Sequence, residues 1–152
     1  MLTNILHPNR YHGFSAKPPY FEGWYYKLVS ADQNTRFAII PGAYISPDPA
    51  KSHAFVQVFD SQADKVNFHR YPFKAFKAHK RSFEIRVAEN LFTADQISLS
   101  IADDLEQIEG SLSFSKIITM AGAIFLARCH GLVRLGAFHG VLPWGRQYGS
   151  CH

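Results

Sequence analysis

Short runs of alternating apolar and polar residues recur along the chain up to about residue 116. Phe83-Glu84-Ile85-Arg86-Val87 is one such run, and Ile97-Ser98-Leu99-Ser100-Ile101 is another. A period of two is typical of a strand with one buried face, and no segment here shows a sustained helical period. Turn residues such as Ser46-Pro47-Asp48-Pro49 separate the runs. The pattern predicts strands near residues 20–30, 36–45, 52–60, 64–70, 82–88, 96–102 and 106–115.

This series of short strands predicts an all-β protein, with an antiparallel sheet that curls into a barrel or half-barrel. Small barrels of this kind can enclose one apolar ligand. At 152 residues, 47% of them hydrophobic, the chain is long enough for one domain with its own core. The net charge of +4 is too small to require a nucleic-acid partner. The two cysteines, Cys129 and Cys151, fit neither a disulfide framework nor a metal-site spacing.

The beginning of the chain and its hydropathy bear on where the protein is located. The first residues, MLTNILHPNR, lack the basic start and apolar core of a secretory signal. The chain has no run of about 18 apolar residues, so we expect no transmembrane helix. The sequence therefore predicts a protein that is cytoplasmic or peripheral to a membrane.

The strand expected at 20–30 contains the strongest candidate for chemistry, a single acid among five aromatic residues. Its sequence is Tyr20-Phe21-Glu22-Gly23-Trp24-Tyr25-Tyr26-Lys27. Alternation places Glu22, Trp24 and Tyr26 on one side, and Phe21 and Tyr25 on the other. If the first side faces a closed interior, a carboxyl group lies among aromatic rings, where desolvation favours its neutral form. A general acid is built in this way.

These residues resemble the opening of the tocopherol cyclase family. The resemblance lies in His7-Pro8, in Tyr11-His12-Gly13 and in the block FEGWYYK that contains Glu22. It continues in the strands at 36–42 and 53–60 and covers residues 7 to 116. It implies a lipocalin-like barrel that closes a ring without a redox change: an alkene in a prenyl tail is protonated, and a neighbouring phenol oxygen captures the cation. No cofactor is needed. Family members are longer, so this chain corresponds to their first half.

With this reaction in view, the aromatic strand and the loop before it supply the candidate site. Glu22 is the expected acid, and Tyr11 and His12 lie at the mouth of the site as further catalytic candidates. The expected substrate-binding residues are Trp24, Tyr26 and Phe21, because aromatic faces stabilise a developing cation. In the alternative interpretation, Glu22 faces solvent beside a basic side chain, Trp24 belongs to the core, and His12 is an ordinary loop histidine.

The remaining histidines and cations suggest no second chemistry. His53, His69 and His79 lie in separate elements without ligand-like spacing, so no metal site is predicted. Residues 69–81 interleave basic and aromatic side chains, a pattern that can bind single-stranded nucleic acid, rest on an anionic membrane or form a solvated edge that prevents aggregation. The predicted partner is a small lipophilic substrate, a prenylated phenol or terpenoid, with membrane-surface contact through 69–81 and no nucleic acid.

The character of the sequence changes after Ser115, where the strand alternation is lost. An amphipathic helix and a short hydrophobic anchor are two interpretations of this tail, and a frameshift is a third. The family is expected to continue with a segment like GVMGWFAWVPFMECYHGVVSM. Read from the second base of each codon, residues 129–132 can encode Val-Met-Gly-Trp, and residues 138–144 can encode Phe-Met-Glu-Cys-Tyr-His-Gly. We therefore place a slip in the reading frame near residues 116 to 119.

The frameshift interpretation divides the chain into residues 1–116, the family-like β domain, and residues 117–152, a tail without a native fold. The expected function is tocopherol cyclase-like ring closure, inactive in this fragment because a half-barrel leaves one side open to water. The alternatives are a lipid- or terpenoid-binding barrel that is not an enzyme, and a truncated gene product without function.

Overall fold

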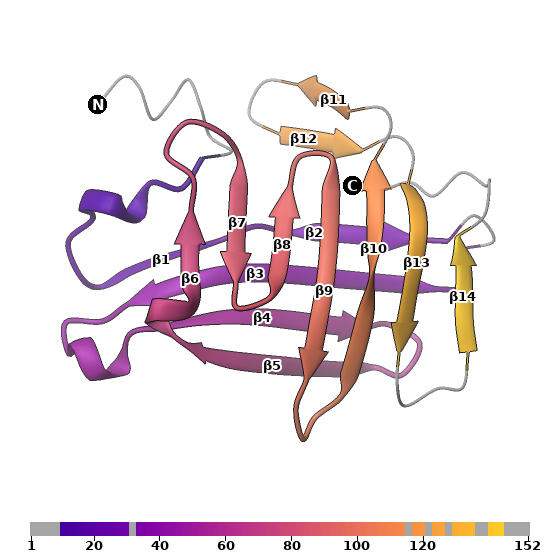
Figure 1. Cartoon of the computed structure of the whole chain (residues 1–152), viewed down its shortest axis with the longest axis horizontal. Helices are drawn as coiled ribbons and strands as arrows, with labels where there is room; N and C mark the ends of the chain where they lie inside the picture. Colours follow the sequence, from indigo (N-terminus) through magenta and orange to yellow (C-terminus); the bar gives the residue numbers. More distant parts are fainter. Residues whose placement is uncertain are drawn as a thin grey trace.

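In a computed structural model, the chain forms two antiparallel sheets that face each other (Figure 1). The structure describes residues 10–30, 33–114, 117–120, 123–126, 129–135 and 140–144, the last four ranges as backbone only. Three short 3-10 turns, η1 (Gly13–Ser15), η2 (Pro49–Lys51) and η3 (Phe73–Ala75), lie between strands. The strands of the second sheet run across those of the first (Figure 1).

The first sheet has the order β1-β3-β4-β5, and β2 pairs with β3 as well. Its strands are β1 (Tyr20–Gly23), β2 (Tyr26–Val29), β3 (Arg36–Ile45), β4 (His53–Asp60) and β5 (Lys65–Pro72). The predicted strand at 20–30 is thus two strands, which share one edge of β3. β1 pairs with Gly42–Ile45, and β2 pairs with Arg36–Ile39.

Pro41 explains why the predicted strand is interrupted. The amide of Trp24 donates to the carbonyl of Pro41 at 3.0 Å, so the polar groups of Pro41 point toward the β1–β2 edge. Proline has no N–H to return this bond, so the ladder is broken opposite Trp24 and Tyr25. The break leaves Tyr25 exposed and Trp24 half-buried.

The second sheet has the order β14-β13-β10-β9-β8-β7-β6, and a separate hairpin joins β11 to β12. The strands are β6 (Phe76–Ala78), β7 (Glu84–Val87), β8 (Asn90–Thr93), β9 (Gln96–Ala102), β10 (Gln107–Phe114), β11 (Ile117–Met120), β12 (Ala123–Leu126), β13 (Cys129–Leu135) and β14 (Gly140–Trp144). β5 leads through η3 into β6, so the chain passes from one sheet to the other at this corner.

One apolar core fills the space between the inner faces of the two sheets. Tyr26 of β2 meets the rings of Phe83 and Phe92 at centroid distances of 6.4 and 5.8 Å. The core also contains the inward residues of both sheets, among them Leu28, Ile39, Val56, Ile85, Ile97, Ile108 and Leu112. Burial of these side chains stabilises the fold at roughly 25 cal/mol per Å² of apolar surface.

The predicted all-β antiparallel fold is confirmed, and the open arrangement of the described strands matches the half-barrel alternative. β3, β4, β5, β7, β9 and β10 lie close to their predicted positions. Two short strands, β6 and β8, were not predicted. In the tail, every described residue lies in a strand, so the amphipathic helix does not apply there. The frameshift interpretation itself remains a prediction.

Candidate functional site

Glu22 lies on the inner face of β1, where its carboxylate receives three contacts. Its Oε2 accepts hydrogen bonds from the backbone N–H of His12 at 2.9 Å and from the hydroxyl of Tyr20 at 2.7 Å. Its Oε1 lies 2.8 Å from Nδ1 of His12. The side chain of Glu22 is 14% exposed, and that of His12 is 24% exposed. The acid is therefore held in a fixed position near the protein surface.

Two of these contacts have fixed donors, and the third does not. The His12 amide and the Tyr20 hydroxyl both donate to Oε2, so this oxygen acts as an acceptor. Between Oε1 and Nδ1, a proton can belong to either atom, depending on the protonation state and tautomer of His12. Oε1 and Nδ1 thus form a point of the cluster at which a proton can be exchanged within a hydrogen bond.

The loop before β1 brings His12 to Glu22. Tyr11 is buried at 7% exposure, and its ring folds back over Gly13. A Cβ atom at Gly13 would lie 2.2 Å from the hydroxyl oxygen of Tyr11, so a residue with a side chain cannot occupy this position without moving the ring. Burial, and to a smaller extent the carboxylate of Glu22, raises the pKa of Tyr11 to about 12. The phenol is therefore neutral at physiological pH.

Aromatic rings surround this end of the inner face. The Tyr11 ring lies 6.2 Å from Trp24 and 4.9 Å from Phe76 between centroids. Trp24 also packs against Phe76 and Phe83, at 6.5 and 5.8 Å. Trp24 and Phe76 are only half-buried, so this aromatic cluster borders the core and also reaches solvent.

The structure brings together four of the six residues that the sequence suggested. Glu22 and His12 are in contact, and Tyr11 and Trp24 lie beside them. Tyr26 is buried at 6% exposure, and its hydroxyl donates to the carbonyl of Thr93 at 3.3 Å, which places it in the core between the sheets. Phe21 lies on the opposite face of the first sheet and stacks on Phe55, so it is not brought together with Glu22.

Sequence reasoning missed three members of the cluster, Tyr20, Phe76 and Phe83. Tyr20 precedes Glu22 by two residues in the same strand, so the alternation that placed Trp24 beside Glu22 could have placed Tyr20 there too. Burial, with the hydrogen bond to Glu22 next in size, raises the pKa of Tyr20. Phe76 comes from β6 in the other sheet, and no local pattern identifies that contact.

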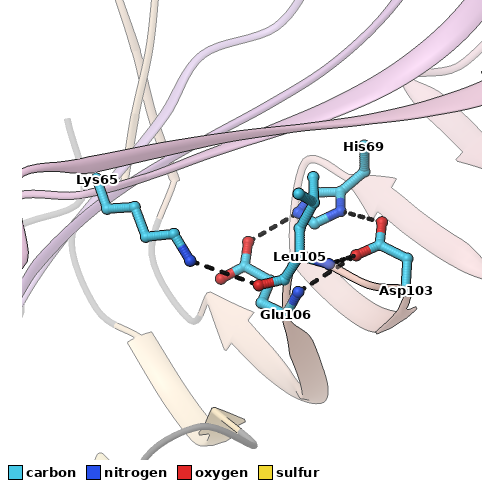
Figure 2. Close-up of polar contacts among 5 residues, drawn as sticks. All are labelled: Lys65, His69, Asp103, Leu105 and Glu106. Carbon is cyan, nitrogen blue, oxygen red and sulfur yellow. Dashed lines mark hydrogen bonds and ion pairs between the residues drawn. The ribbon is translucent and has the colours of Figure 1, made fainter.

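A second polar cluster lies at another place between the sheets (Figure 2). The fully buried imidazole of His69, on β5, lies between two carboxylates from the β9–β10 hairpin: its Nδ1 is 2.5 Å from Oδ2 of Asp103, and its Nε2 is 2.7 Å from Oε1 of Glu106. The backbone amides of Leu105 and Glu106 both donate to Oδ1 of Asp103. The amine of Lys65 donates to the carbonyl of Leu105 (Figure 2).

The charges of this cluster stabilise one another. Burial alone would lower the pKa of His69, but the hydrogen bonds with Glu106 and Asp103 outweigh it and raise the pKa. Burial alone would raise the pKa values of Asp103 and Glu106. The hydrogen bonds with His69 outweigh burial, so both pKa values are lowered. Because each ring nitrogen faces a carboxylate, this geometry favours the imidazolium form of His69 and the ionised form of both acids. Both ring nitrogens are occupied by these bonds, which favours a structural role.

The basic stretch at 69–81 is divided among several elements. His69 is buried, whereas Lys74, Lys77, Lys80 and Arg81 are exposed around η3, β6 and the turn that follows. The amine of Lys80 lies 5.8 Å from the ring centroid of Phe14. In the part of the chain that the structure describes, no group of three or more metal-ligating side chains is placed to hold an ion. The same residues include no helix long and apolar enough to cross a membrane.

Comparisons with known proteins do not assign the site. No family model matches the chain, and no match is found among the curated proteins or the solved structures.

Proposed function

We propose that this chain is the N-terminal part of a tocopherol cyclase-like protein in which Glu22 is the acid of a redox-neutral ring closure. The substrate is a prenylated phenol or a related terpenoid lipid. The observation that supports the proposal most is the position of Glu22: a single half-buried carboxyl group, held by His12 and Tyr20, at the edge of an aromatic cluster that reaches solvent.

The proposed reaction is balanced in protons. Glu22 donates its proton to one carbon of the alkene, and the other carbon becomes cationic. The phenol oxygen attacks that carbon, a C–O bond forms and the phenolic proton leaves. The imidazole of His12 takes up this proton at its other nitrogen and passes a proton from Nδ1 to Oε1 of Glu22, so the substrate is isomerised without an oxidant or a cofactor. Trp24 and Tyr11 line the cationic side with their ring faces, which attract positive charge.

The contacts support separate roles for the two oxygens of Glu22. Oε2 accepts both fixed donors, so these bonds orient the carboxyl group. Oε1 faces His12, where a proton can be exchanged, and is the oxygen from which we expect the transfer. Positioned general acids contribute about 10²–10⁴-fold to a rate. In the 152-residue chain, we expect water to compete at this site, and we expect turnover only in the frame-restored protein.

The half-buried aromatic cluster also favours a second candidate function, the binding of a lipid or terpenoid without chemistry. Trp24, Tyr11 and Phe76 offer an apolar contact surface that does not depend on an acid. The exposed cations at 69–81 supply the proposed contact with a membrane surface. A truncated product without either function is the remaining alternative.

The test is to incubate the 152-residue chain and the frame-restored protein with a prenylated hydroquinone in D₂O. Because cyclisation is an isomerisation, the informative product is a chromanol that carries one carbon-bound deuterium. We expect it from the restored protein alone, and we expect Glu22→Gln to reduce its formation at least about 100-fold. Glu84→Gln, on the exposed end of β7, is the matched control. Binding of the substrate without any chromanol would favour the binding protein, and unchanged turnover in Glu22→Gln would remove Glu22 from the mechanism.

A further inference from the structure

The outer face of the first sheet carries exposed aromatic side chains that neither the core nor the Glu22 cluster uses. Register and alternation point every second residue of β1 to β5 away from the second sheet. Phe21 is 63% exposed, Val66 is 51% exposed and Phe68 is 44% exposed. We call this surface the outer aromatic face; its members are Phe21, Tyr44, His53, Phe55, Val66 and Phe68.

Three phenylalanine rings form a continuous stack across this face. Phe55 of β4 lies 5.5 Å from Phe21 of β1 and 5.0 Å from Phe68 of β5, in near-parallel orientation. β3 separates β1 from β4, and Gly42 makes the crossing possible: a Cβ atom there would lie 2.3 Å from Cζ of Phe55. The outer rings cover Phe55, which is only 2% exposed, and remain exposed themselves.

The charged groups on this face all have the same sign. The charged residues at outward positions of β1 to β5 are Lys27, Arg36 and Arg70, and no Asp or Glu occupies an outward position in these five described strands. Arg70 lies directly opposite Phe55 in the pairing of β4 with β5. The face thus combines exposed hydrocarbon with positive charge.

We propose that the outer aromatic face docks on an anionic phospholipid bilayer. Phe21, Phe68 and Val66 carry no polar group, so they gain most from contact with lipid hydrocarbon near the headgroups. Lys27, Arg36 and Arg70 are attracted to the negative surface of such a bilayer. This surface lies on the opposite side of the sheet from Glu22, and the proposal does not depend on the proposed ring closure.

Other occupants fit these observations less well. Stacking of this face on a second copy by two-fold symmetry would bring Lys27, Arg36 and Arg70 toward the same cations of the partner. Single-stranded nucleic acid stacks its bases on successive free ring faces, and the central ring of this stack, Phe55, is covered by both of its neighbours.

The test is sedimentation of the full chain with vesicles of phosphatidylcholine, with and without phosphatidylglycerol. We expect binding only to the anionic vesicles, weakened by salt. Phe21→Gln and Phe68→Gln should each reduce the partition coefficient about tenfold. Leu105→Gln, which replaces an exposed leucine in the β9–β10 hairpin, is the matched apolar control. Lys27→Gln should weaken binding more than Lys77→Gln, which removes the same charge from β6.

Any of the following results would overturn the proposal. It fails if the chain ignores anionic vesicles, or if Leu105→Gln reduces binding as much as Phe21→Gln does. A loss seen with Lys77→Gln alone would move membrane contact from this face, Arg70 included, to the cations of η3, β6 and the turn that follows. Self-association that Phe21→Gln abolishes would assign the face to a second copy, and oligonucleotide binding that it abolishes would assign it to nucleic acid. Thermal melts show whether each variant is folded. Phe68→Gln, on β5, tests the face without a change in β1, the strand that carries Phe21 and Glu22.

Discussion

Nε2 of His69 lies 2.7 Å from Oε1 of Glu106, and this contact joins the edge strand of the first sheet to a hairpin of the second (Figure 2). β5 is the last strand in its sheet and presents His69 inward, where the aliphatic core would otherwise continue. A fully buried imidazole is stable here because each nitrogen meets a carboxylate. The two sheets are thus joined to each other by charge at this point.

The first prediction is that this cluster makes stability depend on pH in both directions. The pKa of His69 is raised above 6.5, so its contribution is fully present below pH 6.5 and is lost as the pH rises through the raised value. The pKa values of Asp103 and Glu106 are lowered below 3.8 and 4.5, so their contribution is lost as the pH falls through the lowered values. Urea unfolding at a series of pH values should show maximal stability between these limits.

Glu106→Gln tests the cause of this pH dependence. The amide keeps the shape of the side chain but removes a charge, and we expect a loss of about 1–3 kcal/mol near pH 6. NMR titration should show a lower pKa for His69 in this variant. Glu109→Gln, at an exposed position of β10, the strand that follows the hairpin with Glu106, is the control and should change neither quantity. An unchanged His69 pKa in Glu106→Gln would contradict the assigned ion pair.

The second prediction concerns the two glycines that face each other in β1 and β3. Gly42→Ala should destabilise the protein by about 1–3 kcal/mol, because the new Cβ would lie 2.3 Å from the Phe55 ring and 2.6 Å from the backbone oxygen of Glu22. Gly23→Ala is the matched control, since its Cβ would meet nothing closer than the Pro41 oxygen at 3.3 Å. Thermal melts compare them. If both variants lost the same stability, room for the Phe55 ring would not be the reason for glycine at position 42.

The strands could be predicted where alternation was long and turn residues were distinct, as in β9. β6 was hidden because it has three residues and its lysine lies within a basic stretch. β8 was hidden because a tight turn, with Ala88 at a φ of 52°, precedes four residues that lack a clear pattern. Such short strands are defined by their partners across the sheet more than by their own sequence.

The candidate site was predictable only in part, for a similar reason. Alternation placed Glu22 and Trp24 on one face, and the structure agrees. The contact between His12 and Glu22 joins residues ten apart through an irregular loop, and local periodicity does not determine where such a loop leads. The cluster around His69 joins residues more than thirty apart, and a histidine within a basic, aromatic stretch gave no sign of two acidic partners.

The third prediction concerns the nucleotide sequence beyond codon 116. If the tail results from a slip in the reading frame, the plus-one frame should encode the continuation expected from the family resemblance, including the region downstream of codon 152. Sequencing this region provides the measurement, and the codons for residues 129–132 and 138–144 are the most informative. A downstream region without a family-like open frame would eliminate the frameshift interpretation and, with it, the frame-restored enzyme.

The fourth prediction is that residues 117–152 contribute little to the stability of the described core. The core cluster from Tyr11 to Phe114 and the ion-pair cluster around His69 are both built from residues that precede the tail. A chain that ends at residue 116 should therefore keep a cooperative unfolding transition and the raised pKa of His69. Hydrogen exchange in the full chain should show low protection throughout the tail.

The opposite result would also be easy to recognise, because β13 pairs with β10 over seven residue pairs whose amides would then be protected. Strong protection over residues 129–135, together with loss of cooperativity on truncation, would identify the tail as a native part of the second sheet and contradict its interpretation as a translation error.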